Sequence, residues 1–383
     1  MTERVRLLCY IGSLNAGGAE RQVLEILHGL DRARFAPHLL LAHRSGPLLA
    51  EVPADVPLFC CSDAAPPVAG KLARWRRWRY FAQLLRDLRI DLVYDRTYLA
   101  TLDAAVACWL RPTPRISAAV ADPAVQFRLY ARRPMVLWRA LSRWAYHSAD
   151  LVLANSEGLR RQLLAFWGLP PEQVVVQPNA VDFERLDRLA AEPCPFPRDG
   201  RFRLLTVGRI DDDKGHVDLL AALAELVQRE GWRDWLWQVI GTGPRETLLR
   251  EQAAQDHLSE HVQFLGVVNN PFPYYRAADL FVLPSRTEGF PNVLLEALGC
   301  GTPVIAADCD SGPRELLAHG RYGQLTPVRD PPALAAALKE GRQQIQRWRA
   351  AAAEGRAFVR ERYSRDRVLR QLEASMLAVL QRS

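Results

Sequence analysis

The sequence predicts an α/β protein with two Rossmann-like, doubly wound parallel-sheet domains that face each other across a cleft. The chain has 383 residues, of which 49% are hydrophobic, and this length fits two to three domains of roughly 150 residues each. Short apolar runs alternate with longer stretches of helical periodicity, which is typical of a parallel sheet covered by helices on both faces. Three prolines at positions 193, 195 and 197 interrupt this alternation and exclude a helix or a central strand there.

The first part of the chain forms one predicted domain, at residues 1–190. Its clearest pairs of a strand with a following helix are Val5–Ile11 with Ala19–Leu30, Leu92–Tyr94 with Leu99–Trp109, and Leu151–Ala154 with Ser156–Trp167. Residues 191–201 contain the three prolines and are the predicted linker between the domains.

The second domain is predicted at residues 202–362. Strands are expected near 203–207, 235–240, 262–264, 280–283 and 303–306, and helices are expected to start at His216, Arg245, Asn292 and Pro331. The chain ends in helical sequence, and we expect residues 363–383 to pack back on the first domain. Ligands of doubly wound sheets bind beyond the carboxyl ends of the strands, so functional residues are sought in the loops that follow strands.

The composition excludes several classes of protein. No uncharged apolar run reaches the 18 or so residues that a membrane span needs, and the first residues include Glu3, Arg4 and Arg6 without a cleavage-site pattern. The seven cysteines include no C-x-x-C pair, which favours reduced thiols over a disulfide framework or a structural zinc site. These features predict a cytoplasmic chain without a membrane span.

A glycine-rich turn follows the first predicted strand. Gly12 and Gly17 have the spacing of a P-loop, but Gly18 and Ala19 occupy the positions where that loop needs Lys and Ser or Thr, so nucleotide chemistry of the P-loop type is disfavoured. The turn is instead predicted to present backbone N–H groups at a helix N-terminus, which favours phosphate. A tight turn without a ligand is the alternative.

A second loop carries two cations. Gly208 and Arg209 end a predicted strand, and Lys214 precedes the next helix, in a chain where only three of the 50 basic residues are lysine. Two cations and a helix dipole directed at one place suit a diphosphate, whereas a solvated charged loop is the alternative. Asp211 and Asp213 resemble a D-x-D metal signature, but an acidic run before a helix is more typical of capping. We therefore expect no metal and no cofactor.

Two further patterns are weak. Gly241 and Gly243 lack the third glycine of a dinucleotide fingerprint, because Glu246 occupies its place. His257 and His261 have helical spacing without the glutamate of an H-E-x-x-H motif, which favours a solvated helix face over a metal site.

The most informative segment is Pro284–Ala306. Glu288 follows a predicted strand, and Pro291 and Asn292 begin a helix that carries Glu296. The segment thus combines two carboxylates, which accept hydrogen bonds from hydroxyls, with helix N–H groups, which donate to oxygens, and a sugar nucleotide requires both. A hydrolase pair of carboxylates is the alternative, but such pairs lie on opposite sides of a sugar and come from separate strands.

Together these motifs resemble the retaining nucleotide-sugar glycosyltransferases of family 4, also called glycosyl transferases group 1, over nearly the full chain. The motifs are Gly17-Gly18-Ala19-Glu20-Arg21, Asn155-Ser156-Glu157, Pro178-Asn179-Ala180-Val181-Asp182, Val207-Gly208-Arg209 with Lys214-Gly215, Phe264-Leu265-Gly266, and the E-x7-E pair Glu288 and Glu296. The resemblance implies the GT-B fold and transfer of a sugar from a nucleotide-sugar donor with retention of configuration.

The resemblance also implies roles for individual residues. Arg209 and Lys214 would hold the donor diphosphate, Glu296 the ribose hydroxyls, and Glu288 the transferred sugar. The candidate catalytic residues are therefore Glu288, Arg209 and Lys214. The remaining candidate donor-binding positions are Gly17, Gly18, Gly208, Gly289, Phe290, Pro291, Asn292 and Val293.

The identity of the substrates is predicted from the same resemblance. The form Glu-Gly-Phe-Pro-Asn resembles members that use UDP-hexoses or UDP-N-acetylhexosamines to build lipid-linked bacterial oligosaccharides. The predicted donor is a UDP-sugar, and the predicted acceptor is a lipid-linked glycan or polysaccharide of the cell surface, such as lipopolysaccharide or capsule. A sugar-nucleotide isomerase of the same fold, such as a UDP-N-acetylglucosamine 2-epimerase, is the alternative.

One departure from the family concerns the acceptor side. Many members carry a His or Arg at the end of the strand that matches residues 115–119, but this chain continues with Val120, Ala121 and Asp122. Glu20, Asp122 and Arg128 are the remaining candidates for acceptor contact.

A basic region predicts a further partner. Residues 71–143 contain 15 Lys and Arg against five Asp and Glu, and arginines alternate with aromatic residues in 71–81 and 128–146. A helix of this composition can lie on an anionic bilayer, and nucleic acid is the rival partner. Because acceptors of the resembled family are often lipid-linked, we expect peripheral binding at the inner face of the plasma membrane and no nucleic acid.

Overall fold

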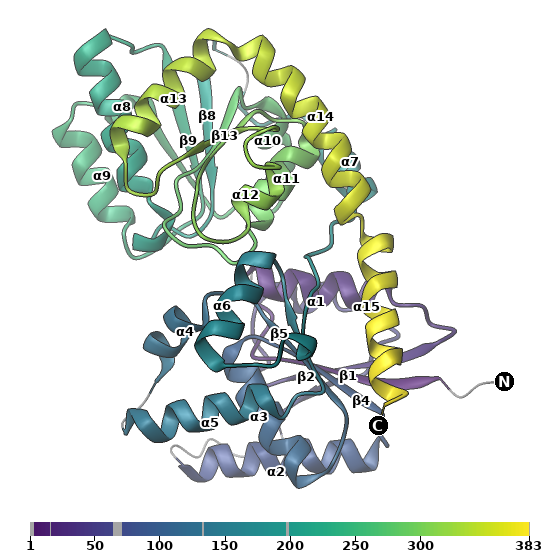
Figure 1. Cartoon of the computed structure of the whole chain (residues 1–383). Helices are drawn as coiled ribbons and strands as arrows, with labels where there is room; N and C mark the ends of the chain where they lie inside the picture. Colours follow the sequence, from purple (N-terminus) through teal and green to yellow (C-terminus); the bar gives the residue numbers. More distant parts are fainter. Residues whose placement is uncertain (1–3, 16, 64–70, 132–133, 197–198, 383) are drawn as a thin grey trace. The chain divides into compact units, whose positions relative to one another are not determined.

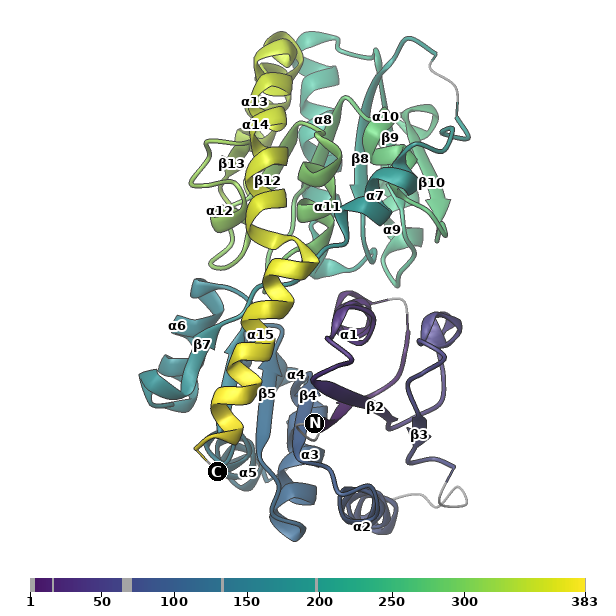
Figure 2. The ribbon, with the colours of Figure 1, turned by 90° about the vertical axis from the view of Figure 1, so that its right-hand side faces the viewer.

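The structure is a computed structural model that describes residues 4–15, 17–63, 71–131, 134–196 and 199–382, with residues 71–73 described by their backbone alone. The chain forms two compact units (Figures 1 and 2). The first unit is Met1–Ala180 with Arg365–Ser383, and the second unit is Val181–Ser364.

The first unit contains a seven-stranded parallel sheet with the order β3-β2-β1-β4-β5-β6-β7. Its strands are β1 (Val5–Ile11), β2 (Phe35–Leu41), β3 (Leu58–Cys60), β4 (Leu92–Arg96), β5 (Arg115–Ala119), β6 (Leu151–Ala154) and β7 (Val174–Val176). The chain adds β2 and β3 on one side of β1 and then crosses to add β4 on the other. The topological switch point, where such sheets bind ligands, therefore lies between β1 and β4.

Helices cover both faces of this sheet, as the alternating side chains of β1 require. Leu7, Cys9 and Ile11 pack in a core with α1 (Gly18–Gly29) and α15 (Arg365–Leu380). Leu8 and Tyr10 pack on the opposite face in a core with α2 (Lys71–Asp87) and α3 (Tyr98–Leu110). Figure 1 shows α2, α3 and α5 side by side, in agreement with their contacts. The helices of the unit are α1 (Gly18–Gly29), α2 (Lys71–Asp87), α3 (Tyr98–Leu110), α4 (Pro123–Tyr130), α5 (Met135–His147), α6 (Glu157–Trp167) and α15 (Arg365–Leu380).

The second unit contains a six-stranded parallel sheet with the order β10-β9-β8-β11-β12-β13. Its strands are β8 (Phe202–Val207), β9 (Trp235–Ile240), β10 (Val262–Gly266), β11 (Leu280–Leu283), β12 (Val304–Ala307) and β13 (Gln324–Thr326). Here β9 and β10 lie on one side of β8, and β11 lies on the other. The switch point of the second unit is therefore between β8 and β11.

The helices of the second unit also form two layers. One core joins α8 and α13 to the sheet, and the other joins α7, α10, α11 and α14 to its opposite face. The helices are α7 (Phe183–Ala190), α8 (His216–Glu230), α9 (Glu246–Gln255), α10 (Phe272–Ala277), α11 (Asn292–Cys300), α12 (Pro313–Leu316), α13 (Pro331–Gln343) and α14 (Ile345–Tyr363).

The first boundary between the units differs from the one expected at residue 190. The chain passes into the second unit between Ala180 and Val181, because α7 buries Phe183 and Leu186 in the core of that unit. The predicted linker 191–201 thus lies within the second unit, and its residues 197 and 198 are outside the described residues.

The second boundary falls between Ser364 and Arg365, two residues after the expected position at 362. Helix α15 then belongs to the first unit. It buries Leu369, Leu372 and Met376 in the core that also contains α1.

Candidate functional site

The loops that follow β8 and β11 are held against each other at the switch point of the second unit. Gly215 has a φ of +65°, and a Cβ at this position would overlap the carbonyl oxygen of Pro284, so only glycine permits this approach. The Arg286 N–H donates to the Asp213 carbonyl (2.7 Å), and the Arg286 guanidinium binds the Asp218 carboxylate at 2.9 Å. These contacts fix the loop that carries Lys214 relative to the loop that carries Glu288.

Lys214 and Glu288, predicted from two separate motifs, form an ion pair. The Lys214 Nζ lies 2.6 Å from the Glu288 Oε1, and the Glu288 side chain is only 10% exposed. Burial on its own lowers the pKa of Lys214, but attraction and a hydrogen bond from Glu288, together with Asp211, outweigh it and raise the pKa. Lys214 is therefore a stable cation at the carboxyl edge of the sheet.

Arg209 is the second cation of this edge and is largely exposed. Its guanidinium Nε donates to the Asp211 Oδ2 at 2.6 Å, and its side chain is 73% exposed. The other oxygen of Asp211 accepts from the Lys214 N–H at 3.2 Å and caps the short 3₁₀ helix η3 (Asp212–Lys214). Asp211 thus orders the loop as a capping residue and binds Arg209. The second aspartate of the D-x-D pattern, Asp213, accepts a hydrogen bond from the Arg286 N–H through its backbone carbonyl.

Gly241 and Gly243 have a packing role in this site. A Cβ on Gly241 would overlap the carbonyl oxygen of Gly208, and one on Gly243 would overlap that of Ile210. The Ile210 N–H also donates to the Thr242 carbonyl at 3.0 Å. These two glycines therefore let the Arg209 loop lie against the β9–α9 connection.

The Glu288 loop leads directly into α11, which carries Glu296. Glu296 is half-buried and accepts a hydrogen bond from the Tyr275 hydroxyl of α10 at 3.1 Å. Phe290 is buried against Tyr363, with 5.5 Å between the ring centroids, and the Ser311 hydroxyl donates to the Glu288 carbonyl. The ring of Phe290 therefore anchors the loop, and at this position only the backbone is left for the predicted donor role.

In the first unit, helix α1, which follows the glycine-rich turn, is tied to the segment that ends at Ala180. The Gln22 side chain of α1 accepts from the Ala180 N–H (2.7 Å) and donates to its carbonyl (2.8 Å). Helix α1 begins at Gly18, and the Glu20 carboxylate lies where a Cβ of Gly17 would be. Burial raises the pKa of Glu20, and its own N–H and Arg96 partly oppose that shift.

Arg96 was missed by the sequence analysis, which ended the strand at Tyr94. It is the last residue of β4 and is 6% exposed. Its guanidinium donates to the Tyr94 hydroxyl (3.0 Å) and to the Asn179 Oδ1 (2.6 Å). The only signal in the sequence is its position at the end of a strand next to the switch point.

Two of the predicted acceptor contacts have other surroundings. Asp122 caps α4, because its Oδ1 accepts from the Ala124 N–H (2.7 Å) and the Val125 N–H (3.3 Å). Arg128 is exposed on the same helix. Among the hydrogen bonds and ion pairs of the described residues, none joins Glu20, Asp122 or Arg128 to one another.

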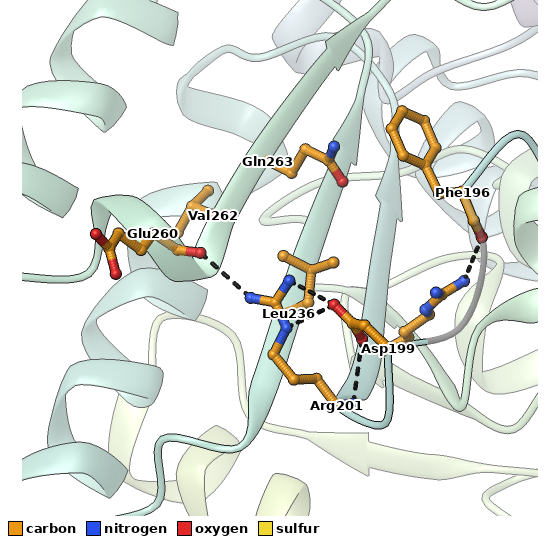
Figure 3. A pocket seen from close by; sticks show the side chains of 8 residues that line it. Phe196, Asp199, Arg201, Leu236, Glu260, Val262 and Gln263 are labelled. Atoms are coloured by element: carbon orange, nitrogen blue, oxygen red, sulfur yellow. Dashed lines mark hydrogen bonds and ion pairs between the residues drawn. The ribbon is translucent and has the colours of Figure 1, made fainter.

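A hollow of about 280 Å³ lies at the other edge of the second sheet, near the amino ends of β8, β9 and β10 (Figure 3). Its arginines already have partners: Arg201 binds Asp199 at 2.6 Å, and Arg203 donates to the Phe196 carbonyl. This hollow lies away from the loops that carry Arg209, Lys214 and Glu288. It is therefore not our candidate site.

Two family models match the chain. The one described as "Glycosyl transferases group 1" matches residues 201–341, and the one described as "Glycosyltransferase Family 4" matches residues 16–185.

Among curated proteins, the chain is 29% identical over 343 residues to an N-acetylgalactosamine-N,N'-diacetylbacillosaminyl-diphospho-undecaprenol 4-alpha-N-acetylgalactosaminyltransferase of Campylobacter jejuni. That alignment covers 87% of this chain and 89% of the relative. A phosphatidyl-myo-inositol mannosyltransferase of Mycolicibacterium smegmatis is 42% identical over 147 residues, which is 37% of this chain and 36% of that protein.

Solved structures show the same fold. Sucrose-phosphate synthase of Thermosynechococcus elongatus superimposes with a TM-score of 0.82 at 19% identity, over 99% of this chain and 100% of that one. HepE of Anabaena, in complex with UDP and glucose, superimposes with a TM-score of 0.80 at 21% identity, over 98% of this chain and 100% of that one.

Proposed function

Since this chain belongs to the group 1 glycosyltransferases of family 4 and has their GT-B fold, we propose that it transfers a sugar from a UDP-sugar to a lipid-linked acceptor with retention of configuration. The observation that carries the proposal is the ion pair of Lys214 with Glu288, next to Arg209, at the switch point of the second unit. This arrangement offers cations to a diphosphate and a carboxylate to sugar hydroxyls within one site.

The donor diphosphate binds through exchange of partners. Lys214 and Arg209 each have a carboxylate neighbour, and the diphosphate, which carries more charge than either, takes over these cations. Glu288 then has its carboxylate available for the hydroxyls of the transferred sugar. Glu296, one helical turn further along α11, accepts from the ribose hydroxyls.

The transfer needs no side-chain base. The bond between the anomeric carbon and the β-phosphate oxygen breaks, and the acceptor hydroxyl oxygen bonds to the anomeric carbon on the same face. The acceptor proton passes to the departing β-phosphate oxygen. This route agrees with a chain in which Asp122 caps a helix. The cations stabilise the charge that develops on the phosphate.

We propose that transfer proceeds without a divalent metal. The oxygens of Asp211 already bind Arg209 and the Lys214 N–H, and Asp212 binds Arg245 at 2.7 Å. Activity in EDTA should therefore equal activity in buffer. Loss of activity in EDTA that manganese restores would assign the aspartates of this loop to a metal instead.

The names of relatives support the choice of substrates. The Campylobacter jejuni protein is named for an acceptor linked to diphospho-undecaprenol, and HepE was solved with UDP. An isomerase has no such support, because both named relatives are transferases. We propose a UDP-hexose or UDP-N-acetylhexosamine as donor and a lipid-linked glycan of the cell surface as acceptor.

We also propose peripheral binding to the inner face of the plasma membrane. No helix in the described ranges is both long and apolar enough to cross a bilayer. The end of α4 and the start of α5 expose a group of large apolar side chains, with Val136 the most exposed at 80%. This apolar tip consists of Leu129, Tyr130, Met135, Val136 and Leu137. Arginine side chains close to this apolar tip favour binding to an anionic bilayer surface.

Several aromatic residues of the predicted membrane-binding region are not available to a bilayer. Phe81 and Trp138 are buried in the cores of the first unit, and Trp78 donates to Asp103 at 2.7 Å. Trp75 and Trp144 remain exposed. Arg132 and Arg133 lie outside the described residues. The proposed surface therefore depends on the apolar tip and on the exposed arginines.

A panel of UDP- and GDP-sugars in a thermal-shift assay tests the proposed function, followed by transfer assays with the sugar that binds. We expect a UDP-sugar to raise the melting temperature. An epimeric sugar nucleotide formed from the donor without any acceptor would overturn the assignment as a transferase and favour the isomerase.

A further inference from the structure

The backbone of Glu288 is held by the loop that follows β12, residues 308–312, which we call the β12 loop. The Ser311 hydroxyl donates to the Glu288 carbonyl, and Ser311 is only 3% exposed. The next residue, Gly312, has a φ of +86°, and a Cβ at this position would overlap the ring of Pro291. The β12 loop therefore packs directly against the segment that carries Glu288.

A second side chain of the β12 loop lies at the same residue. Cys309 is buried, as is Ser311, whereas Asp310 between them is exposed. Burial raises the pKa of the Cys309 thiol to about 12, and repulsion from Glu288 adds to this shift. The Cys309 N–H, Lys214 and a hydrogen bond from the Glu288 N–H oppose it. A neutral thiol thus lies at the Glu288 N–H, and the Ser311 hydroxyl lies at the Glu288 carbonyl.

The β12 loop is itself fixed at both ends. The Asp308 N–H donates to the Thr326 carbonyl of β13 at 2.8 Å. The Leu316 N–H of α12 donates to the Gly312 carbonyl at 3.0 Å, and the Leu316 side chain is fully buried in the core of the second unit. A loop that is anchored in this way can hold a neighbouring functional residue in one position.

The side chain and the backbone of Glu288 respond differently to a donor. The carboxylate is held by Lys214 at 2.6 Å, and in the proposed function the donor diphosphate takes over this cation. Glu288 then loses its ionic partner when its carboxylate must be aligned with the sugar. The hydrogen bond from Ser311 is buried, so the diphosphate does not displace it. The backbone contact is therefore the one that persists during transfer.

We propose that Ser311 is a positioning residue, which keeps the Glu288 carboxylate aligned with the transferred sugar after the donor diphosphate has taken over Lys214. This inference rests on the proposed function, in which Glu288 acts on the sugar. Ser311 touches no substrate and acts through Glu288. Loss of its hydroxyl should therefore lower kcat, because alignment matters most in the transition state, and should change the donor KM little.

Steady-state kinetics of Ser311→Ala test this role, with the UDP-sugar that the wild type uses. We expect kcat to fall about five- to a hundredfold, the range for a buried carbonyl left without a hydrogen bond. Ser142→Ala is the matched control. Ser142 is fully buried in the first unit, and its hydroxyl donates to the Trp138 carbonyl of α5 at 2.8 Å. This variant loses a similar hydrogen bond and should keep the wild-type kcat.

A double-mutant cycle separates positioning from a merely structural role. If Ser311 acts through the Glu288 carboxylate, Ser311→Ala should have little further effect on kcat in the Glu288→Gln protein. An equal fall in both backgrounds would show a structural role and overturn the inference. A normal kcat in folded Ser311→Ala, or a raised donor KM with an unchanged kcat, would overturn it as well.

Hydrogen exchange of the Glu288 N–H in the wild-type protein decides the question if Ser311→Ala does not fold. We expect slow exchange both in buffer and with saturating UDP, because the β12 loop still holds the backbone when UDP has taken over Lys214. Fast exchange with UDP bound would rule out the positioning role. Failure of UDP to bind would count against the proposed function, and the exchange in buffer would still test the contact of the β12 loop with Glu288.

Discussion

The two switch points of this protein have the same topology and different charges. At the β8–β11 point, three cations each have a carboxylate partner: Lys214 has Glu288, Arg209 has Asp211, and Arg286 has Asp218. At the β1–β4 point, the hydrogen-bond partners of Arg96 within the described part of the chain are the neutral Tyr94 hydroxyl and the neutral Asn179 side chain. The sheet order thus determines where ligands approach, and the side chains on each edge determine how they are held.

The difference in ionic partners suggests different roles for the two switch points. In the second unit, ion pairs with carboxylates order the loops that carry Lys214, Arg209 and Arg286. In our proposal, the donor diphosphate takes the place of a carboxylate partner. In the first unit, the buried Arg96 guanidinium donates to the Tyr94 hydroxyl and to the Asn179 side chain. We therefore expect substitutions among the ion pairs of the second unit to affect the chemical step most.

The largest effect is expected from Glu288→Gln in the second unit. Glu288 lies beside the reacting sugar in our proposal, so its charge acts mainly in the transition state, and kcat should fall by about two to three decades. Steady-state kinetics with the donor found in the thermal-shift panel measure this change. Glu251→Gln, an exposed position on α9, is the matched control, and a normal kcat for Glu288→Gln would remove Glu288 from the mechanism.

The next largest effect is a pH dependence of stability, and it arises from a residue of the second unit. His216 is buried, and burial, with a smaller contribution from Lys214, lowers its pKa from 6.5 to about 4. The unfolded chain therefore binds a proton below about pH 6.5 that the folded chain excludes, and this contribution to stability is lost as the pH falls from 6.5 towards 4. The loss is at most about 3 kcal/mol.

Urea unfolding at pH 7 and at pH 4.5 measures this loss. The variant His216→Phe keeps a ring for stacking on Trp237, which lies 6.2 Å away between centroids. It should lose less stability than the wild type over this interval. Equal losses in both proteins would show that His216 is not the group responsible.

A smaller effect is expected from Glu296→Ala, which sharpens the division of roles within the second unit. Contacts to the nucleoside are the same in the ground state and the transition state, so the donor KM should rise about ten- to a hundredfold with little change in kcat. Tyr275→Phe removes only the hydroxyl that binds Glu296 and should change KM less. A fall in kcat without a rise in KM would place Glu296 next to the reacting atoms.

The smallest effect is expected at the membrane surface of the first unit. Arg76 and Arg79 are exposed on α2, and each should contribute about 1 kcal/mol to binding of anionic vesicles at low salt. Arg77 is left unchanged because it lies 3.4 Å from the Asp103 carboxylate. Co-sedimentation of Arg76→Ser/Arg79→Ser should fall, whereas Arg229→Ser in the second unit should not. Equal binding of both variants would exclude α2 from the surface.

The sequence was most informative about features that depend on local patterns. Strand ends, glycines and the rare lysine at 214 pointed to the loops of Lys214 and Glu288, since each signal lies within a few residues. The structure brings these two side chains into an ion pair, and their role in donor binding stays a prediction. The buried position of Arg96 was not predicted, because it depends on residues distant in sequence, Asn179 among them. The boundary at Ala180 was missed for the same reason, because α7 belongs to the second unit through its packing.

A crystal structure with UDP tests the central claim most directly, namely that the β8–β11 edge of the second unit holds the donor. We expect the diphosphate within hydrogen-bond distance of Arg209 and Lys214, the Lys214 Nζ no longer shared with Glu288 alone, and the ribose hydroxyls on the Glu296 carboxylate. UDP bound elsewhere, with the Lys214–Glu288 pair unchanged and Glu296 not in contact with the nucleotide, would contradict it.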